Sequence, residues 1–541
     1  MNFIKKLLYT VAVIALPFTS FAQSDDDEKP KENWQNLDLK ADGVFGISTE
    51  KAYNELLKGK SSKTVIVAVI DGGIDEEHED LKQVMWVNAK EIAGNGIDDD
   101  KNGYIDDIHG WNFIGKVHYD NMEVVRLINK LQPKYAAALN STPFNEEERK
   151  EFQLYKKLVT DYMAKLQQAQ MGLQNTTLIL KYLDGMLVIM GKTEPTIEDF
   201  NNYKTEGDIE SQVLKFLKPE IKKTSYKEFR KELEDGIEHY DAQVKYHLNL
   251  EFDPRKDSVG DNYANSYEKY YGNNDITGPD AEHGTHVAGI IGAVRNNGLG
   301  IKGVADNVRI MALRTVPDGD ERDKDVANSI RYAVDNGAKI INMSFGKAYS
   351  WDKKVVDEAV KYAVSKDVLM VHAAGNDGKN TEKEDNVPNR LYVDSTGVTM
   401  GTAEGWIEVG ASGWENDETL VASFSNYGGK SVDVFAPGVK INSTMPGSKY
   451  KENDGTSMAS PVVAGLAALI RSYYPHFSAV QVKEIIMNSV AKVDQKVKIR
   501  EEGSSSKVLL SEISVSGGIV NAYNALLLAE KTNSTAAVKS K

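Results

Sequence analysis

The stretch from residue 455 to residue 470 constrains the fold of this chain more than any other part of the sequence. It reads Gly-Thr-Ser-Met-Ala-Ser-Pro-Val-Val-Ala-Gly-Leu-Ala-Ala-Leu-Ile and contains no charged residue. A helix with small residues and Leu all round has no face that suits water, so the run after Pro461 predicts a helix buried on nearly all sides. A chain of 541 residues is long enough to bury such a helix in a substantial core.

Ser457 comes just before this run, at or just inside the N-terminus of the predicted helix. The first turn of a helix has unpaired N–H groups and a positive partial charge, which together stabilise an anion. Two interpretations of Ser457 follow. It caps the helix, which is the usual role of an isolated Ser there, or it is a nucleophile whose own N–H helps to hold the oxyanion that it creates.

The amino-acid composition limits the classes of protein to which the chain can belong. With 41% hydrophobic and 27% charged residues, it is ordinary for a globular protein of about two to four domains. The net charge of −15 argues against a nucleic-acid partner, because phosphate binding needs a basic surface. The absence of cysteine excludes disulfides, thiolate metal sites and cysteine nucleophiles.

Residues 1–22 have the pattern of a secretory signal peptide. Two lysines supply the positive start, residues 7–18 the short apolar core, and residues 20–22 a small-x-small cleavage site. The alternative is a membrane anchor, but the apolar run is shorter than the roughly 20 residues that a span needs. We expect export to a periplasm or to the medium, with no membrane span in the mature chain. Residues 23–60 follow as an N-terminal leader that begins acidic and polar.

Apolar strands alternate with helical segments along much of the chain, which is typical of an α/β fold with a doubly wound, mostly parallel sheet. Residues 64–70 form a continuous, mostly β-branched run, as expected of a strand buried on both faces. Asp71 ends this run, where open α/β sheets place their active sites. It is equally well explained as a cap of the next loop. Further predicted strands and helices lie at 308–313, 325–336, 340–344, 352–366, 368–374, 406–411 and 432–438.

The amino-acid composition and the pattern of apolar residues change between residues 117 and 250. Lys, Glu, Leu and Tyr dominate, glycine is sparse, and apolar residues recur at helical spacing in 146–183 and 226–248. This pattern predicts an inserted α-helical subdomain of about three to five helices. We expect its apolar stripes to form its own core rather than a groove for a partner. After residue 250 the chain returns to loops rich in Asn, Asp, Gly and Tyr.

Residues 95–107 contain part of the pattern of a calcium-binding loop. Acidic or amide side chains stand at the first, third, fifth and ninth places, and Gly103 at the sixth. The twelfth place holds His109 instead of a bidentate Glu, so a turn cluster that binds nothing is the alternative. The candidate ligands are Asp98, Asp100, Asn102 and Asp106.

Two further segments carry polar side chains in places that suit a catalytic site. His283 and His286 open a helix of small residues, but no Glu stands between them as it does in a zinc-binding H-E-x-x-H motif. We therefore expect His283 to face a site and His286 to be structural. Asn376 follows the predicted strand 368–374. It either makes the turn beside Gly375 or directs its amide into the same cleft as Ser457.

Four blocks of this sequence resemble the signature blocks of the subtilisin-like serine peptidase family, in the same order along the chain. They are Val-Ile-Asp-Gly-Gly-Ile-Asp at 69–75, His-Gly-Thr-His-Val-Ala-Gly at 283–289, Ala-Ala-Gly-Asn at 373–376 and Gly-Thr-Ser-Met-Ala-Ser-Pro at 455–461. The resemblance implies an endopeptidase that cleaves protein or peptide substrates through an acyl-enzyme and needs no cofactor for its chemistry. Calcium remains a structural ion only.

The resemblance also implies roles for individual residues. Asp71 orients His283, which takes the proton of Ser457 and later delivers it to the leaving amine. Asn376 donates its amide to the oxyanion. Ser344, Phe345 and Gly346 form the edge on which an extended peptide adds as a strand. The segment Pro317-Asp318-Gly319-Asp320 forms the opposite edge, with two acids that favour basic residues upstream of the scissile bond.

The resemblance covers roughly residues 60–110 and 271–528, which divides the chain into parts. We expect a peptidase domain in two pieces, 61–116 and 251–530, around the helical insertion at 117–250, with a polar tail at 531–541. The insertion either gates the cleft, binds a partner or selects substrates. The leader is short for a folded pro-domain, which puts autocatalytic maturation in doubt. One alternative is an inactive relative that binds peptides or partners through the insertion, which would lack a residue of the triad. The other is an ester hydrolase, which would carry G-x-S-x-G around its serine.

Overall fold

The structure is a computed structural model that describes residues 29–539, apart from 141, 257, 395–396 and 502–503. The predicted signal peptide, residues 1–22, lies outside the described residues. The described residues divide into two compact units. We call residues 160–248 the helical unit and the other described residues the sheet unit.

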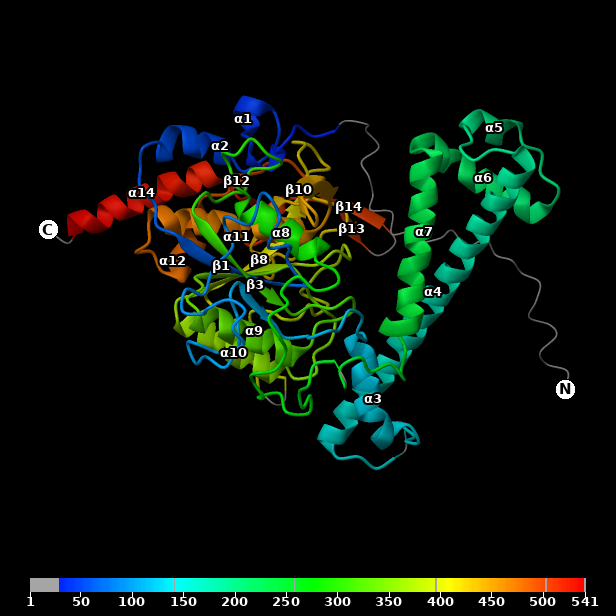
Figure 1. The fold of residues 1–541 in the computed structure, drawn as a ribbon, viewed down its shortest axis with the longest axis horizontal. Helices are drawn as coiled ribbons and strands as arrows, with labels where there is room; N and C mark the ends of the chain where they lie inside the picture. Colours follow the sequence, from blue (N-terminus) through cyan, green and yellow to red (C-terminus); the bar gives the residue numbers. More distant parts are fainter. Residues whose placement is uncertain (1–28, 141, 257, 395–396, 502–503, 540–541) are drawn as a thin grey trace. The chain divides into compact units, whose positions relative to one another are not determined.

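The sheet unit is built on a nine-stranded sheet (Figure 1). Neighbouring strands run parallel except for one antiparallel pair, β12 and β15, at one edge. The spatial order is β12 (Ala491–Lys492), β15 (Gly518–Ile519), β9 (Val434–Pro437), β8 (Trp406–Ser412), β5 (Leu369–Ala373), β4 (Ile340–Met343), β1 (Val65–Asp71), β3 (Val308–Arg314) and β2 (Gly110–Asn112). The predicted α/β class with a mostly parallel sheet is thus confirmed.

Helices cover both faces of this sheet, as the side chains of β1 require. Val65, Val67 and Val69 pack into one core, and Ala68 and Ile70 pack into a second core on the other face. The second core contains α9 (Asp323–Asp335) and α10 (Lys353–Ser365). The first contains α8 (Glu282–Gly292), α11 (Thr456–Tyr473), α12 (Ala479–Asn488) and α14 (Ala522–Lys539).

Helix α11 is the most deeply buried helix-forming stretch that the sequence predicted. Nearly all of its residues are buried, and Ser457 in its first turn is half-buried. Pro461 lies in the second turn, where its missing N–H leaves the Ser457 carbonyl without its donor within the helix. The Ser344 hydroxyl donates to this carbonyl at 2.9 Å in its place. The helix therefore packs into the first core with its N-terminus at the carboxyl end of the sheet.

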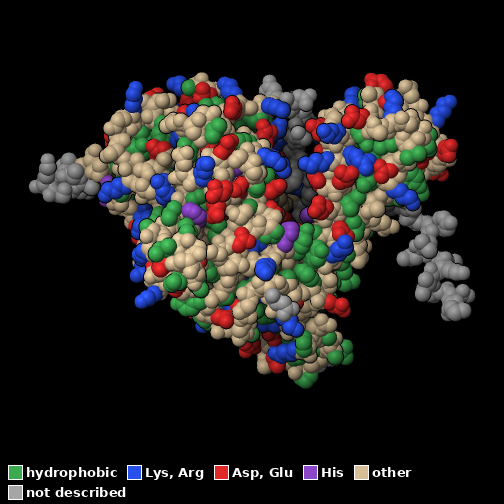
Figure 2. All heavy atoms as spheres, viewed as in Figure 1, with side chains coloured by type: hydrophobic (Ala, Val, Ile, Leu, Met, Phe, Trp, Pro, Cys, Tyr) green, Lys and Arg blue, Asp and Glu red, His purple; other side chains and the backbone are tan. Residues whose placement is uncertain are grey.

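Short hairpins and helices complete the sheet unit. The hairpins are β6 (Leu391–Val393) with β7 (Thr399–Thr402), β10 (Ile441–Met445) with β11 (Lys449–Asn453), and β13 (Val497–Glu501) with β14 (Ser504–Val508). The short helix α13 (Leu510–Ile513) follows the last of these hairpins. Figure 2 shows acidic and basic side chains interspersed over the face of this unit that it presents.

The N-terminal leader joins the sheet unit instead of forming a unit of its own. Its short elements are η1 (Trp34–Asn36), α1 (Leu39–Asp42), α2 (Thr49–Ala52) and η2 (Tyr53–Leu57). The Trp34 ring is buried in the first core, and its Nε1–H donates to the carbonyls of Val439 and Lys440 at 3.2 and 3.3 Å. Ile47 is buried in the same core. From Trp34 onward the leader is thus an integral part of the domain.

The helical unit has a core of its own. Its elements are most of α4 (Glu146–Met190), with α5 (Ile197–Asn202), α6 (Asp208–Lys223), α7 (Tyr226–Ala242) and η3 (Gln243–His247). The buried residues of this core are Ile179, Leu183, Met186, Phe200, Val213, Leu214, Leu217, Ile221, Phe229 and Leu233. The unit is shorter than the predicted insertion, 117–250, because α3 (Glu123–Tyr135) and its neighbours pack in the sheet unit.

Two observations concern the predicted tail and membrane span. Helix α14 runs to Lys539, so the tail at 531–541 is helical as far as the structure describes it. Within the described residues, every helix is too short or too polar to cross a membrane.

Candidate active site

The carboxylate of Asp71 stands at the carboxyl end of β1, in the middle of the sheet, with its side chain only 4% exposed. Its Oδ1 accepts the N–H of Gly72 at 2.8 Å and lies 2.8 Å from Nδ1 of His283. A carboxylate can only accept, so His283 carries its proton on Nδ1 and leaves a lone pair on Nε2. The contact therefore sets the tautomer that a general base needs.

The His283 ring belongs to the first turn of α8, and its side chain is 45% exposed. Burial works to lower the pKa of this imidazole, but the charge and hydrogen bond of Asp71 outweigh it, so the pKa of His283 is raised above its ordinary value. Asp71 thus stabilises the imidazolium that would form when His283 accepts a proton.

Ser457 is the second residue of α11, and its hydroxyl has a partner in this structure. Its Oγ donates to the carbonyl of Ser344 at 3.0 Å, and the Oγ of Ser344 donates back to the carbonyl of Ser457 at 2.9 Å. Within the described residues, Ser457 Oγ makes no hydrogen bond with His283. A change of side-chain rotamer redirects this hydroxyl, and catalytic hydrogen bonds are commonly loose until substrate binds.

Asn376 is oriented by the residue that precedes Ser457. Its Oδ1 accepts both the backbone N–H and the hydroxyl of Thr456, each at 2.9 Å, which turns its Nδ2 away from that contact. A methyl group built on Gly455 would lie 3.5 Å from the Ser457 backbone N and 3.6 Å from Asn376 Nδ2. Two N–H donors therefore border the same small space beside the Cα atom of Gly455. The φ of +149° at Gly455 also favours glycine.

The predicted substrate edge directly follows β4. Ser344 is buried against Ser457, Phe345 is half-buried in the second core, and Gly346 is exposed. A side chain at Gly346 would meet Oδ1 of Asn386 at 2.4 Å. Asn386 in turn donates to the carbonyls of Ala373 and Ala374 at the end of β5, at 3.3 and 3.1 Å.

Sequence reasoning missed Asn386. It lies between the ends of β4 and β5 and closes the space beside Gly346. A single Asn in a loop that is rich in Asn and Glu gives no local signal of this role. Only the approach of the two strand ends identifies it.

The predicted opposite edge, residues 317–320, is hydrogen-bonded to the segment that leads into α3. Asp318 donates its N–H to the His118 carbonyl at 2.8 Å and accepts the N–H of Asp120 at 2.9 Å. Asp320 accepts the backbone N–H of Glu123 through its carboxylate, at 2.7 Å. The carboxylate of Asp320 is thus engaged with α3.

The other histidines near this site bind backbone carbonyls. His286 Nε2 lies 3.0 Å from the Lys451 carbonyl, and burial lowers the pKa of His286 to about 4. His78 is also buried, with Nε2 3.1 Å from the Lys449 carbonyl. Both therefore tie the site to β11.

In the candidate calcium loop, Glu91 lies beside two of the four predicted ligands, Asp98 and Asp100. Carboxylate oxygens of Glu91, Asp98 and Asp100 lie within 4.8 Å of one another. Asp106 accepts the backbone N–H groups of Asn95 and Gly96, at 3.1 and 2.9 Å. The carboxylates of Glu91, Asp98 and Asp100 likewise accept backbone N–H groups of the loop, at 2.8 to 3.1 Å. The carboxylates of Glu91, Asp98 and Asp100 are the kind of oxygen ligand that Ca²⁺ prefers. Glu91 lies upstream of the loop pattern, which is why the pattern did not include it.

The Asn102 side chain of the same loop is occupied by protein groups. It accepts the N–H of Tyr104 at 2.8 Å and donates to Asp107 at 2.9 Å. Asn102 and Asp106 thus help to hold the loop together, and their role as calcium ligands stays a prediction.

A parallel sheet with an aspartate–histidine pair and a serine at a helix N-terminus defines a class of protein, and comparisons with known sequences agree with it. A family model described as the subtilase family matches residues 62–507. This chain belongs to the subtilase family. The predicted resemblance is thereby confirmed.

Individual relatives match parts of the chain. It is 44% identical to Thermophilic serine proteinase from Bacillus sp. (strain AK1) over 191 residues, which are 35% of this chain and 42% of that protein. It is 37% identical to Subtilisin BL from Lederbergia lenta over 208 residues, which are 38% of this chain and 69% of that protein. The chain thus spans less than half the length of the first of these relatives.

A solved structure of proteases from Pseudoalteromonas arctica PAMC 21717 is also similar to this chain. The sequence identity is 27%, and the match covers 48% of this chain and 79% of that one, with a TM-score of 0.39.

Proposed function

We propose that this protein is an exported serine endopeptidase that hydrolyses peptide bonds in proteins or peptides. Its catalytic residues are Asp71, His283 and Ser457, and Asn376 completes the oxyanion hole. The observation that carries this proposal is the 2.8 Å contact between Asp71 and His283 at the end of the sheet where α11 begins. Membership of the subtilase family supports the same reaction class.

The proposed reaction begins when the Ser457 hydroxyl leaves the Ser344 carbonyl and turns to Nε2 of His283. Ser457 Oγ attacks the carbonyl carbon of the scissile bond, and its proton passes to Nε2. The charge of Asp71 stabilises the resulting imidazolium. The oxyanion accepts hydrogen bonds from the Ser457 N–H and the Asn376 amide, the two donors that border the space beside Gly455.

His283 then gives its proton to the amine as the C–N bond breaks, which leaves an acyl-enzyme on Ser457. Water attacks the ester in the second half of the reaction, with His283 again as the base. We propose that the acyl side of the substrate lies extended along Ser344, Phe345 and Gly346 and binds through main-chain hydrogen bonds.

Labelling with a fluorophosphonate tests the assembly of this site. The protein beginning at Gln23 is treated with the reagent, and the adduct is located by peptide mapping. We expect an adduct on Ser457 in the wild type and none in Ser457→Ala or His283→Ala, with the melting temperature unchanged in each variant. A folded wild type that forms no adduct, or labelling that survives His283→Ala at the wild-type rate, contradicts the proposal.

Two further parts of the proposal concern location and a metal ion. We propose export by the signal peptide at residues 1–22, to a periplasm or to the medium. We also propose that Glu91, Asp98 and Asp100 hold a structural calcium ion, supported by the proximity of their oxygens. The role of the helical unit, as a gate or as a binding surface for a partner, stays a prediction.

A further inference from the structure

The first turn of helix α3 contains a buried arginine, Arg126, that holds the end of the opposite substrate edge. Arg126 donates through Nη1 to the carbonyl of Asp320 at 3.1 Å and through Nη2 to the carbonyl of Glu321 at 3.2 Å. The same Nη2 donates to the carboxylate of Glu123 at 2.7 Å. The side chains of Arg126 and Glu123 are at most 4% exposed. Burial makes these charge-assisted bonds rigid, because no water competes for them.

A buried lysine connects the same group to the first substrate edge. Lys347 directly follows Gly346, and its Nζ donates to the Glu123 carboxylate at 2.7 Å and to the Glu321 carbonyl at 2.6 Å. It also forms an ion pair with Asp323 at 2.8 Å. Glu123 therefore receives one cation from α3 and one from the substrate edge, and its carboxylate joins the two.

A third contact fixes the segment that leads into α3. Arg322, just before α9, donates to both oxygens of the Asp120 carboxylate, through Nε and Nη2, each at 2.7 Å. Both side chains are at most 5% exposed. We refer to five of the charged residues in these contacts as the α3 clamp, which comprises Asp120, Glu123, Arg126, Arg322 and Lys347.

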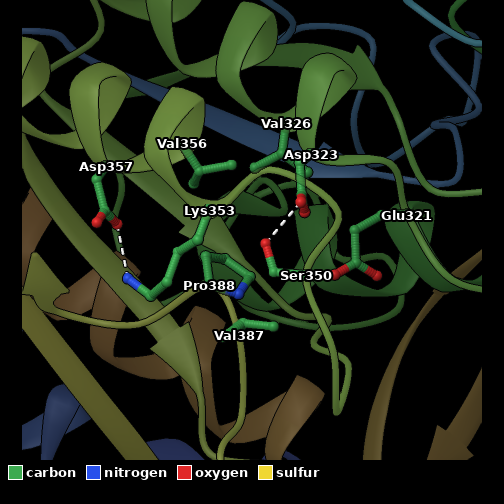
Figure 3. A pocket seen from close by; sticks show the side chains of 9 residues that line it. All are labelled: Glu321, Asp323, Val326, Ser350, Lys353, Val356, Asp357, Val387 and Pro388. Atoms are coloured by element: carbon green, nitrogen blue, oxygen red, sulfur yellow. Dashed lines mark hydrogen bonds and ion pairs between the residues drawn. The ribbon is translucent and has the colours of Figure 1, made fainter. Parts of the chain in front are cut away.

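Two partners of Lys347, Glu321 and Asp323, line a small cavity (Figure 3). The cavity has a volume of about 10 Å³, near the space of one water molecule. Figure 3 shows Glu321 and Asp323 on one side of it and Lys353 with Asp357 on the other. Lys347, by contrast, pairs its backbone with Val387 at 2.9 Å in both directions. The edge residue is thus held both by its main chain and by its ammonium group.

We propose that the α3 clamp positions the two edges of the peptide-binding cleft, so that Arg126 and Lys347 determine how well extended substrates are bound. The clamp holds the backbone at 320–321 and at 347, and these segments continue the two edges between which a substrate strand would lie. Neither residue touches the reacting atoms. The inference rests on the proposed function, because it assumes that 344–346 and 317–320 bind substrate.

The proposal predicts a loss that depends on the length of the substrate. The substrate residue beside the scissile bond is held by the catalytic groups. The binding of substrate residues further upstream depends on the spacing of the two edges. In Lys347→Met, kcat/KM for a chromogenic tetrapeptide should fall about tenfold, mainly through KM, as expected for a few weakened main-chain hydrogen bonds. For an ester of a single amino acid with the same leaving group it should change by less than about twofold.

A matched variant controls for lost stability. Lys483 is half-buried, and its Nζ donates to the Trp406 carbonyl at 2.6 Å and pairs with Asp433 at 3.5 Å, away from both edges. Lys483→Met also removes an ammonium group that is bonded to a carbonyl and a carboxylate, so it should lower the melting temperature without changing the ratio of the two kcat/KM values. If Lys347→Met does not fold, Arg126→Lys keeps the charge, weakens the hold on residues 320–321 and should give the same selective loss.

Equal losses with both substrates in Lys347→Met or Arg126→Lys would overturn the inference, as would unchanged binding of the tetrapeptide. Fluorophosphonate labelling separates this outcome from failure of the proposed function. A clamp variant should label at Ser457 at the wild-type rate. If the wild type itself does not label, the proposed function fails first.

Discussion

Glu321 is a buried carboxyl whose ionisation should destabilise the folded chain. Its side chain is 2% exposed, and Oε1 has no hydrogen-bond partner within the described residues. Burial raises the pKa of Glu321 to about 7; Lys347 opposes this increase, whereas the charges of Asp320 and Asp323 add to it. A carboxyl with a pKa near 7 in the folded chain and near 4.5 in the unfolded chain costs the folded state about 3 kcal/mol when ionised.

The sign of the pH dependence follows from proton binding. Between pH 4.5 and about 7 the folded chain holds a proton on Glu321 that the unfolded chain has lost, so this group's contribution to stability falls as the pH rises. The destabilisation by Glu321 is absent below about pH 4, where the folded and unfolded chains are both protonated, and reaches its full size above about pH 8. Glu321→Gln removes it. The variant should therefore gain stability relative to the wild type by about 3 kcal/mol over this range.

Denaturant unfolding at a series of pH values measures this effect. Both proteins carry Ser457→Ala, which prevents self-digestion during the measurement, and Glu484→Gln is the control that removes an exposed carboxyl of the same unit. The difference in the free energy of unfolding between Glu321→Gln and its parent should grow with a slope approaching about 1.4 kcal/mol per pH unit. A difference that stays constant, or one that shrinks as the pH rises, refutes the reasoning.

Three further predictions concern the catalytic site and the metal loop. Asn376→Ala should lower kcat by about 10²–10³-fold with little change in KM, which is the magnitude found when the corresponding asparagine of subtilisin is replaced. A kcat within about threefold of the wild type, which corresponds to a barrier raised by only ~0.7 kcal/mol, would contradict this prediction. Asp71→Asn should slow labelling of the serine and move the acid limb of its pH profile to lower pH, because Asp71 raises the pKa of His283 and the base works only when neutral; an unmoved limb would argue against this assignment. Calcium should raise the melting temperature of the wild type but not of the double variant Asp98→Asn, Asp100→Asn; an equal response in both would exclude the site.

Local sequence patterns determined much of this fold. The β-branched run at 64–70 forms β1, and its period of two directs Val67 to one core and Ala68 to the other. The stretch after Gly455 forms α11, since its composition suits a helix without a polar face. The signature blocks also identified the family, because each block keeps its chemistry within a few consecutive residues.

The same reasoning does not reach groups that are assembled from distant segments. The metal loop pattern included Asp106 and left out Glu91, since a repeat of ligand places within one loop says nothing about an acid that folds back onto it. The insertion was predicted from residue 117 by its composition, whereas α3 packs in the sheet unit through Arg126 and Glu123.

The sequence by itself therefore determined the strands, the buried helix, the family and the residues of each signature block, because all of these depend on neighbours in the chain. Tertiary structure alone decided the partner of the Ser457 hydroxyl, the place of Asn386 between two strand ends and the contacts of Lys347 with α3. Lys347 and Glu123 stand 224 residues apart in the chain. Such contacts depend on which segments the folded sheet and its helices bring together, and no local pattern of residues encodes that distance.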